Sequence, residues 1–210
     1  MTDNKRYSEM FDYLSAPRAP QTPESTIVFG RKDPLVAKAT GELILANLAP
    51  VVIISGGIGK DSGDILDLGY RSEAHYLETE LAKDASLRGF QLPKVILDEA
   101  AASGGDNARN SLKLLNDNGF STYAVTGVIH ATSAKRLAET VKHEALKATG
   151  SAPDVFIKPT AYNFDASNPA DQDEARAEML RLADWPAKGW LQTQEDLPED
   201  LVDFARNSKN

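Results

Sequence analysis

Glycines and polar side chains that suit ligand binding recur where predicted strands end. The clearest case is the stretch from Val51 to Gly63, in which four β-branched residues lead directly into Ser55-Gly56-Gly57. Glycines permit positive φ and a close approach of the backbone to a ligand, and the N–H groups of such a turn can converge on an anion. The turn therefore predicts a phosphate or carboxylate site, although an isolated Gly-Gly pair also serves as a plain turn.

Other candidates stand at strand ends and helix starts along the chain. The candidate ligand-binding residues are Gly30, Ser55, Gly56, Gly57, Glu73, Asp106, Asn107 and Thr126. The candidate catalytic residues are His130 and Asp98, which could act as acid and base. His130 follows a strand end, whereas His75 and His143 fall within predicted helices and are expected at the surface. For Glu73, stabilisation of a helix N-terminus is the competing interpretation, and for the many carboxylates it is a solvated face.

Named nucleotide and hydrolase motifs do not fit these residues. In the P-loop pattern a glycine should stand where this chain has Ile54, and Ser or Thr should stand at Asp61. The dinucleotide fingerprint opens a helix directly, but this glycine cluster opens a loop over residues 58–70. There is no Gly-x-Ser-x-Gly elbow. The sequence thus argues against a P-loop enzyme, an orthodox dehydrogenase and an α/β-hydrolase.

Alternating strands and helices must position these candidates. The predicted strands are 25–30, 51–54, 94–97, 122–126 and 154–159, with amphipathic helices between them. This order predicts an α/β, Rossmann-like, doubly wound, mainly parallel five-stranded sheet with helices on both faces. Ligands of such sheets bind beyond the carboxyl ends of the strands, which places the candidates on one rim.

Three segments are predicted along the chain. Residues 1–24 form an N-terminal helix and a connector with Pro17, Pro20 and Pro23, and residues 25–160 form the Rossmann-like domain. Residues 161–210 form a small C-terminal helical extension packed on the same domain, with Trp185 and Trp190 in a turn between two helices.

Composition narrows the function classes. The 210 residues, 41% hydrophobic and 26% charged, are ordinary for one globular domain. The absence of cysteine excludes disulfides and thiolate chemistry, and we predict no metal. A formal charge of -8 argues against nucleic-acid binding and favours a small-molecule ligand. The polar start and the lack of a membrane-spanning stretch predict a cytoplasmic protein without membrane association.

Four segments resemble, in order and spacing, the YdcF-like family, catalogued as domain of unknown function 218, with the SanA and ElyC envelope proteins as relatives. They are Ile53 to Gly59, Arg71 to Ala74, Asp98 to Arg109, and Val125-Thr126 with His130. The resemblance covers about residues 25 to 160 and implies a Rossmann-like sheet with a pocket. The pocket would be formed by the Ser-Gly-Gly turn, Glu73 and the Asp106–Asn107 pair. For the YdcF branch it also implies S-adenosylmethionine as a ligand.

The chain departs from that family at several positions. The family usually has Glu where Asp98 and Asp106 stand, and an Arg where Ser133 stands. A Ser-x-Asn-Thr run is replaced around Ser103 and Gly104, and the membrane segment of the SanA and ElyC relatives is absent. These departures affect the expected catalysis more than the expected pocket.

Three functions follow as expectations. The first is a cytoplasmic YdcF-like protein that binds an adenosyl-type ligand, S-adenosylmethionine or a nucleotide, with an unknown reaction. The second is a hydrolase or transferase on a phosphorylated or glycan-like substrate, with His130 and Asp98 as acid and base. The third is a non-enzymatic regulator whose C-terminal helices, with Trp185 and Trp190, form a homodimer or partner surface.

Overall fold

The structure, a computed structural model, describes residues 3–16, 18, 20–22, 24–59, 62–194 and 196–208. Pro17 and Pro23 of the predicted connector, and Lys60 and Asp61 of the glycine-rich loop, lie outside the described residues.

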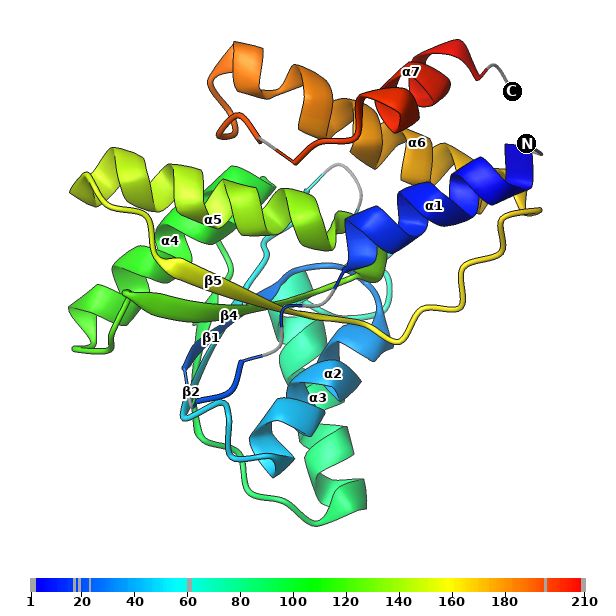
Figure 1. Cartoon of the computed structure of the whole chain (residues 1–210). Helices are drawn as coiled ribbons and strands as arrows, with labels where there is room; N and C mark the ends of the chain where they lie inside the picture. Colours follow the sequence, from blue (N-terminus) through cyan, green and yellow to red (C-terminus); the bar gives the residue numbers. More distant parts are fainter. Residues whose placement is uncertain are drawn as a thin grey trace.

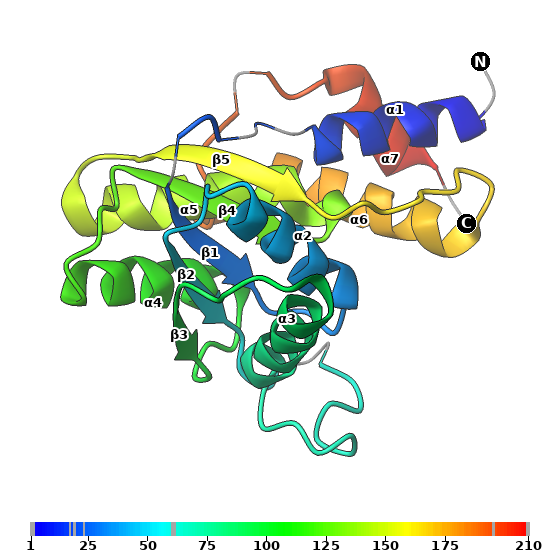
Figure 2. The same ribbon diagram turned by 90° about the horizontal axis from the view of Figure 1, so that it is seen from below.

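A five-stranded sheet forms the centre of the molecule (Figure 1). Its strands are β1 (Ser25–Phe29), β2 (Val51–Ser55), β3 (Lys94–Asp98), β4 (Ala124–Ile129) and β5 (Asp154–Pro159). All four strand pairs are parallel, in the order β3-β2-β1-β4-β5. Figure 2 shows β3 and β5 at opposite edges of this sheet. The predicted α/β fold class with a parallel, doubly wound sheet is confirmed.

Helices cover both faces of the sheet, and their ends follow local sequence signals. The helices are α1 (Asp3–Ser15), α2 (Pro34–Leu45), α3 (Glu73–Arg88), α4 (Gly104–Asp117), α5 (Ala134–Thr149), α6 (Pro169–Asp184) and α7 (Glu199–Asn207), with short 3-10 helices η1 (Ala131–Ser133) and η2 (Pro186–Lys188). Asp33, Ser72 and Ser103 cap α2, α3 and α4 through their side chains, as such residues commonly do. Gly89 and Gly150 end α3 and α5 in the left-handed conformation that glycine favours.

Side chains that point alternately to the two faces of the sheet divide the core into two clusters. Every residue of β1 is buried, which is typical of a strand covered on both faces. Ile27 and Phe29 belong to the cluster formed with α4 and α5, whereas Val28 belongs to the cluster formed with α2 and α3. Alternate side chains of one strand thus hold helices on opposite faces of the sheet.

A third layer of helices lies over α5, and the two ends of the chain build it together. Helices α1, α6 and α7, here termed the helical cap, pack beside one another in both views (Figures 1 and 2). Tyr7 of α1 meets Phe204 of α7 edge to face, with ring centroids 5.2 Å apart. Met10 and Met179 are fully buried in the same cluster. The cap therefore has a hydrophobic core of its own.

Two expectations about strand bounds and burial are wrong. The fourth strand was expected over 122–126, but β4 runs from Ala124 to Ile129. Gly127, which resembled the end of the strand, lies inside it and pairs with Ile27 and Ile157. His143 was expected at the surface but is 8% exposed, because the chain around Gln192 covers that face of α5.

Within the described part of the chain, no helix combines the length and the apolar character needed to cross a membrane.

Candidate ligand-binding site

The carboxyl ends of β1, β2 and β3 lie side by side. In the parallel register Phe29 pairs with Ser55, and Ser55 pairs with Asp98. The backbone continues this arrangement beyond the strands. The N–H of Gly30 donates to the Ser55 carbonyl at 2.6 Å, and the N–H of Gly56 donates to the Asp98 carbonyl at 2.9 Å. The three strand-end turns therefore form one rim.

Close packing of these turns requires glycine. A Cβ atom on Gly30 would lie 2.6 Å from the Cα of Gly56 and 2.6 Å from Oε2 of Glu73. A Cβ atom on Gly57 would lie 2.6 Å from the carbonyl oxygen of Ala101. Neither Gly56 nor Gly57 has a positive φ, although glycine permits it. The glycines are needed because backbone approaches backbone, which is their second common use.

Helix α3 begins at this rim and presents Glu73 to it. The Glu73 N–H donates to the Gly57 carbonyl at 3.2 Å, which joins the helix to the glycine turn. Ser62, in the loop before α3, donates its hydroxyl to Oε1 of Glu73 at 3.0 Å. Since a Cβ on Gly30 would touch Oε2, the carboxylate lies directly over the end of β1.

A buried polar cluster lies behind the rim. The Ser55 hydroxyl donates to Oδ2 of Asp98 at 2.7 Å and lies 3.3 Å from the side-chain amide of Asn107. The N–H of Ala100 donates to Oδ1 of Asp98 at 3.1 Å. One carboxylate oxygen of Asp98 thus binds the end of β2, and the other holds the loop after β3. Asn107 lines the main cavity described below, and Asp98 does not.

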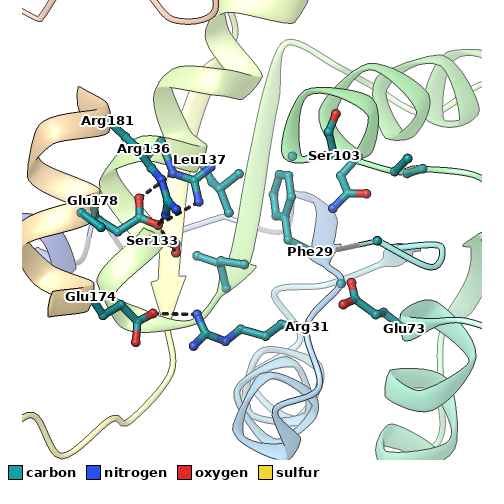
Figure 3. A pocket seen from close by; sticks show the side chains of 18 of the residues that line it. Phe29, Arg31, Glu73, Ser103, Ser133, Arg136, Leu137, Glu174, Glu178 and Arg181 are labelled. Carbon is teal, nitrogen blue, oxygen red and sulfur yellow. Dashed lines mark hydrogen bonds and ion pairs between the residues drawn. The ribbon is translucent and has the colours of Figure 1, made fainter. Parts of the chain in front are cut away.

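The main cavity has a volume of about 690 Å³ and opens beyond the carboxyl ends of β1 and β4 (Figure 3). Its lining includes Gly30 and Arg31 after β1, and Ile129 and Ser133 around the end of β4. The strand order reverses between these two strands, since β2 follows on one side of β1 and β4 on the other. This is the topological switch point, where ligands of open α/β sheets commonly bind.

The two walls of the main cavity differ in chemistry (Figure 3). One wall, from β1, α3 and α4, carries Glu73, Ser103 and Asn107. The other wall comes from α5 and from α6 of the helical cap. It carries the charged residues Arg136, Asp173, Glu174, Glu178 and Arg181. Apolar side chains, including Phe29 and Leu137, line the space between the walls.

Ion pairs organise the charged wall. Arg31 Nη1 lies 2.8 Å from Oε1 of Glu174. Arg136 Nε lies 2.5 Å from Oε2 of Glu178, and Arg181 Nη1 lies 2.6 Å from Oε1 of the same carboxylate. The hydroxyl of Ser133 also donates to Glu178, at 3.0 Å. These contacts fix the arginine side chains at the cavity surface.

Glu174 and Glu178 of this wall stay ionised. Burial raises the pKa of Glu178, but the charges and hydrogen bonds of Arg136, and the charge of Arg181, outweigh burial and hold this pKa below its ordinary value. Burial likewise raises the pKa of Glu174, and Arg31 and Thr132 more than compensate, so this pKa is lowered as well. The wall therefore presents both positive and negative charge to a ligand at neutral pH.

His130 lies behind the charged wall and is 3% exposed. Its Nδ1 is 2.9 Å from the hydroxyl of Thr132, which donates to Glu174 at 2.8 Å. Its Nε2 is 3.9 Å from Oδ2 of Asp33. Burial, followed by the charge of Arg31, lowers the pKa of His130 against the opposing carboxylates. His130 is therefore neutral at pH 7, and it does not itself line the main cavity.

Of the other predicted site residues, Ser55, Gly56 and Gly57 form the rim without lining the main cavity, and Thr126 and Asp106 lie away from it. Thr126 is fully buried inside β4, three residues before the strand ends, because β4 is shifted relative to the predicted strand. Asp106 lies in the first turn of α4, where it exchanges hydrogen bonds with Ser103 and forms an ion pair with Arg109. This is a helix cap, and Asp106 does not line the cavity.

Sequence reasoning missed the charged wall. Glu174, Glu178 and Arg181 recur at four- and three-residue spacing, which places them on one face of α6. That spacing was the available signal. Nothing local indicates that this face meets the end of the sheet, because its position depends on the packing of α6 against α1.

Comparisons with known proteins add no family to this description. No protein-family model and no curated protein matches the sequence. The YdcF-like resemblance therefore stays a prediction. Among the residues that the structure describes, no group of three or more His, Asp or Glu side chains could hold a metal ion.

Proposed function

We propose that the main cavity binds a small adenosyl-type ligand, with S-adenosylmethionine as the first candidate. The observation that carries this proposal is the position and character of the cavity. It lies at the topological switch point, has about 690 Å³ of space, and opposes a carboxylate and amide wall to an arginine and carboxylate wall. Small-molecule sites usually have volumes of about 300–1,000 Å³, and the volume of this cavity falls within that range.

The residues present fit the parts of such a ligand. Glu73, over the end of β1, is an acceptor for ribose hydroxyls, the role that an acidic residue commonly has in dinucleotide-binding sheets. Ala102 and Ala177 offer the more exposed apolar surface for the adenine ring, since Phe29 and Leu137 line the cavity but are 1% and 3% exposed. Arg31 offers a planar guanidinium for the carboxylate of the methionine part, and Glu174 beside it offers a partner for the amino group.

Charge balance favours S-adenosylmethionine over a nucleoside triphosphate. The lining contains three arginines and four carboxylates, the latter being Glu73, Asp173, Glu174 and Glu178. A triphosphate would bring several negative charges close to these carboxylates, which is unfavourable in a partly buried site. S-adenosylmethionine carries a sulfonium and an ammonium group beside one carboxylate, so it matches a wall of mixed charge. When bound, it supplies an activated methyl group, and we assign no reaction to it.

Calorimetry with S-adenosylmethionine, S-adenosylhomocysteine and ATP tests this proposal, together with thermal-shift measurements. We expect saturable binding of the first two ligands. The Glu73→Gln variant should weaken binding by about tenfold to a hundredfold, since a hydrogen bond to a charged group contributes about 1.5–3 kcal/mol. Glu80→Gln is the matched control, because Glu80 is on the same helix and pairs with Lys83 outside the cavity. Absence of heat and of a thermal shift with every ligand would refute the proposal.

The hydrolase or transferase alternative has less support from the geometry. Its acid and base would be His130 and Asp98, and neither lines the main cavity. Asp98 also has both carboxylate oxygens engaged within the protein. A substrate at the cavity would therefore contact the arginines before it could reach either group.

A further inference from the structure

A second cavity, here termed the tryptophan cavity, adjoins the main cavity and has a volume of about 420 Å³. It lies between the start of α4, the outer face of α5 and the turn that follows α6. Ser103, Gly104 and Arg136 line both cavities, so a narrow partition separates them. The proposed adenosyl-ligand function does not use the tryptophan cavity.

Two indole rings form its aromatic side. Trp185 and Trp190 meet edge to face, with ring centroids 5.3 Å apart and planes at 82°. The guanidinium groups of Arg136 and Arg181 lie over Trp185 at 5.4 and 5.8 Å, so its ring is already held by cations. Trp190 is 54% exposed. An indole held by a neighbouring ring and left half open offers a rigid surface for stacking a planar ligand.

Positive charge predominates on the opposite side. The lining contains three cations, Arg109, Arg136 and Lys147, and one carboxylate, Glu144. Arg109 and Lys147 share that carboxylate, at 3.3 and 3.6 Å. Outside the lining, Arg109 also contacts Asp106 and Arg136 contacts Glu178. The main cavity has a slight excess of carboxylates instead, so the two cavities differ in the sign of the charge they favour.

We propose that the tryptophan cavity binds a planar aromatic acid, with the ring against Trp190 and the carboxylate at Arg109 and Lys147. An anion at this position adds a second negative partner for Lys147, which contacts Glu144, and a third for Arg109, which contacts Glu144 and Asp106. Charge-assisted hydrogen bonds to arginine and lysine are about twice as strong as neutral ones. This site is distinct from the adenosyl site, and its occupancy does not depend on the function proposed above.

The chain offers a direct reporter for this site, because Trp185 and Trp190 are its two tryptophans. Protein labelled with 5-fluorotryptophan gives two fluorine resonances, which the Trp190→Phe variant assigns. We titrate the labelled protein with 4-hydroxybenzoate and, separately, with the neutral 4-hydroxybenzamide. We expect a saturable shift of the Trp190 resonance with the acid, at a concentration about tenfold lower than with the amide.

Two lysine variants distinguish binding at this site from a general effect of positive surface charge. Lys147→Gln should weaken binding of the acid severalfold without unfolding the protein, because Lys147 is 57% exposed and its ion pair contributes little to stability. Lys142→Gln should leave binding unchanged. Lys142 is on the same helix as Lys147 and pairs with Glu139, but it does not line the cavity.

Three results would overturn the proposal. The first is no shift of the Trp190 resonance at about 10 mM acid, a concentration that covers weak binding of so small a ligand. The second is equal affinity for the acid and the amide. The third is a shift that depends on protein concentration rather than on the acid, which would identify Trp190 as part of an interface between copies of the chain. Since S-adenosylmethionine is absent from this titration, failure here leaves the calorimetric test of the main cavity unaffected.

Discussion

Arg136 and Arg181 bind the same carboxylate from different environments, and this difference predicts unequal losses of stability. The Arg136 side chain is 13% exposed, that of Arg181 is 41% exposed, and that of Glu178 is 2% exposed. Breaking a buried ion pair by removing one partner commonly costs about 3–5 kcal/mol, whereas an exposed pair contributes about 0–1 kcal/mol. Arg136→Met retains the aliphatic part of the side chain and removes the charge. Because Arg181 still contacts Glu178, we expect a loss near the lower limit, about 3 kcal/mol.

Arg181→Met is the matched control and should lose at most about 1 kcal/mol. The free energy of unfolding is measured by urea denaturation at pH 7 and a fixed ionic strength. A third variant, Arg136→Met with Glu178→Leu, should recover most of the stability, since replacing a buried ion pair by apolar residues is often neutral. Equal losses for the two arginine variants, or a loss below about 1 kcal/mol for Arg136→Met, would refute the reasoning.

The pH dependence of the stability loss in Arg136→Met gives a further check. The pKa of Glu178 is lower in the folded protein than in the unfolded chain, where it is about 4.3. Stability from this group is therefore complete above that value and is lost as the pH falls through the lowered pKa of the folded state. The difference between wild type and Arg136→Met should shrink in the same direction. A difference that stays constant down to the acid limit would contradict an electrostatic origin.

The remaining predictions concern the glycine rim and His130. Gly56→Ala should lower the free energy of unfolding by about 1–3 kcal/mol, because its Cβ would meet the backbone of Gly30 at 2.6 Å. In the same urea assay Gly59→Ala should change stability little, since the nearest atom to its Cβ would be 3.6 Å away, and equal losses for both variants would refute the packing argument. Burial and Arg31 lower the pKa of His130, so the unfolded chain takes up its proton first and stability should fall as the pH drops below about 6.5. His130→Gln should flatten the melting temperature between pH 7 and pH 5, and an unchanged slope would contradict this origin.

The predictable part of the fold is the part that local patterns determine. Helix α3 illustrates this, since Ser72 caps it and Ala74, Leu77 and Leu81 are buried as their spacing predicts. The fourth strand was misplaced because Gly127 resembles a strand terminator. A Cβ at Gly127 would lie 3.1 Å from the side chain of Ile157 on the neighbouring strand, so this glycine makes room for a larger residue. That reason involves a residue thirty positions away, which no local pattern contains.

The candidate site also has one part that the sequence predicts and one part that it does not. Gly30, Ser55, Gly56 and Asp98 could be grouped from the sequence because parallel strands end at one edge, and the structure brings them together. The charged wall could not be grouped with them. Its position depends on how the helical cap packs, and amphipathic spacing shows which face of a helix is polar without showing what that face meets.

The helical cap links both ends of the chain to the main cavity. Helix α6 carries one wall of the cavity on one face and packs its buried residues, such as Met179, against α1. The same helix reaches the sheet through Arg31, which follows β1 and binds Glu174. A hydrophobic core on one side and an ion pair on the other therefore fix the distance between the two walls. Because preorganised groups bind a ligand without further loss of side-chain entropy, this support favours recognition by a formed site rather than by closure around the ligand.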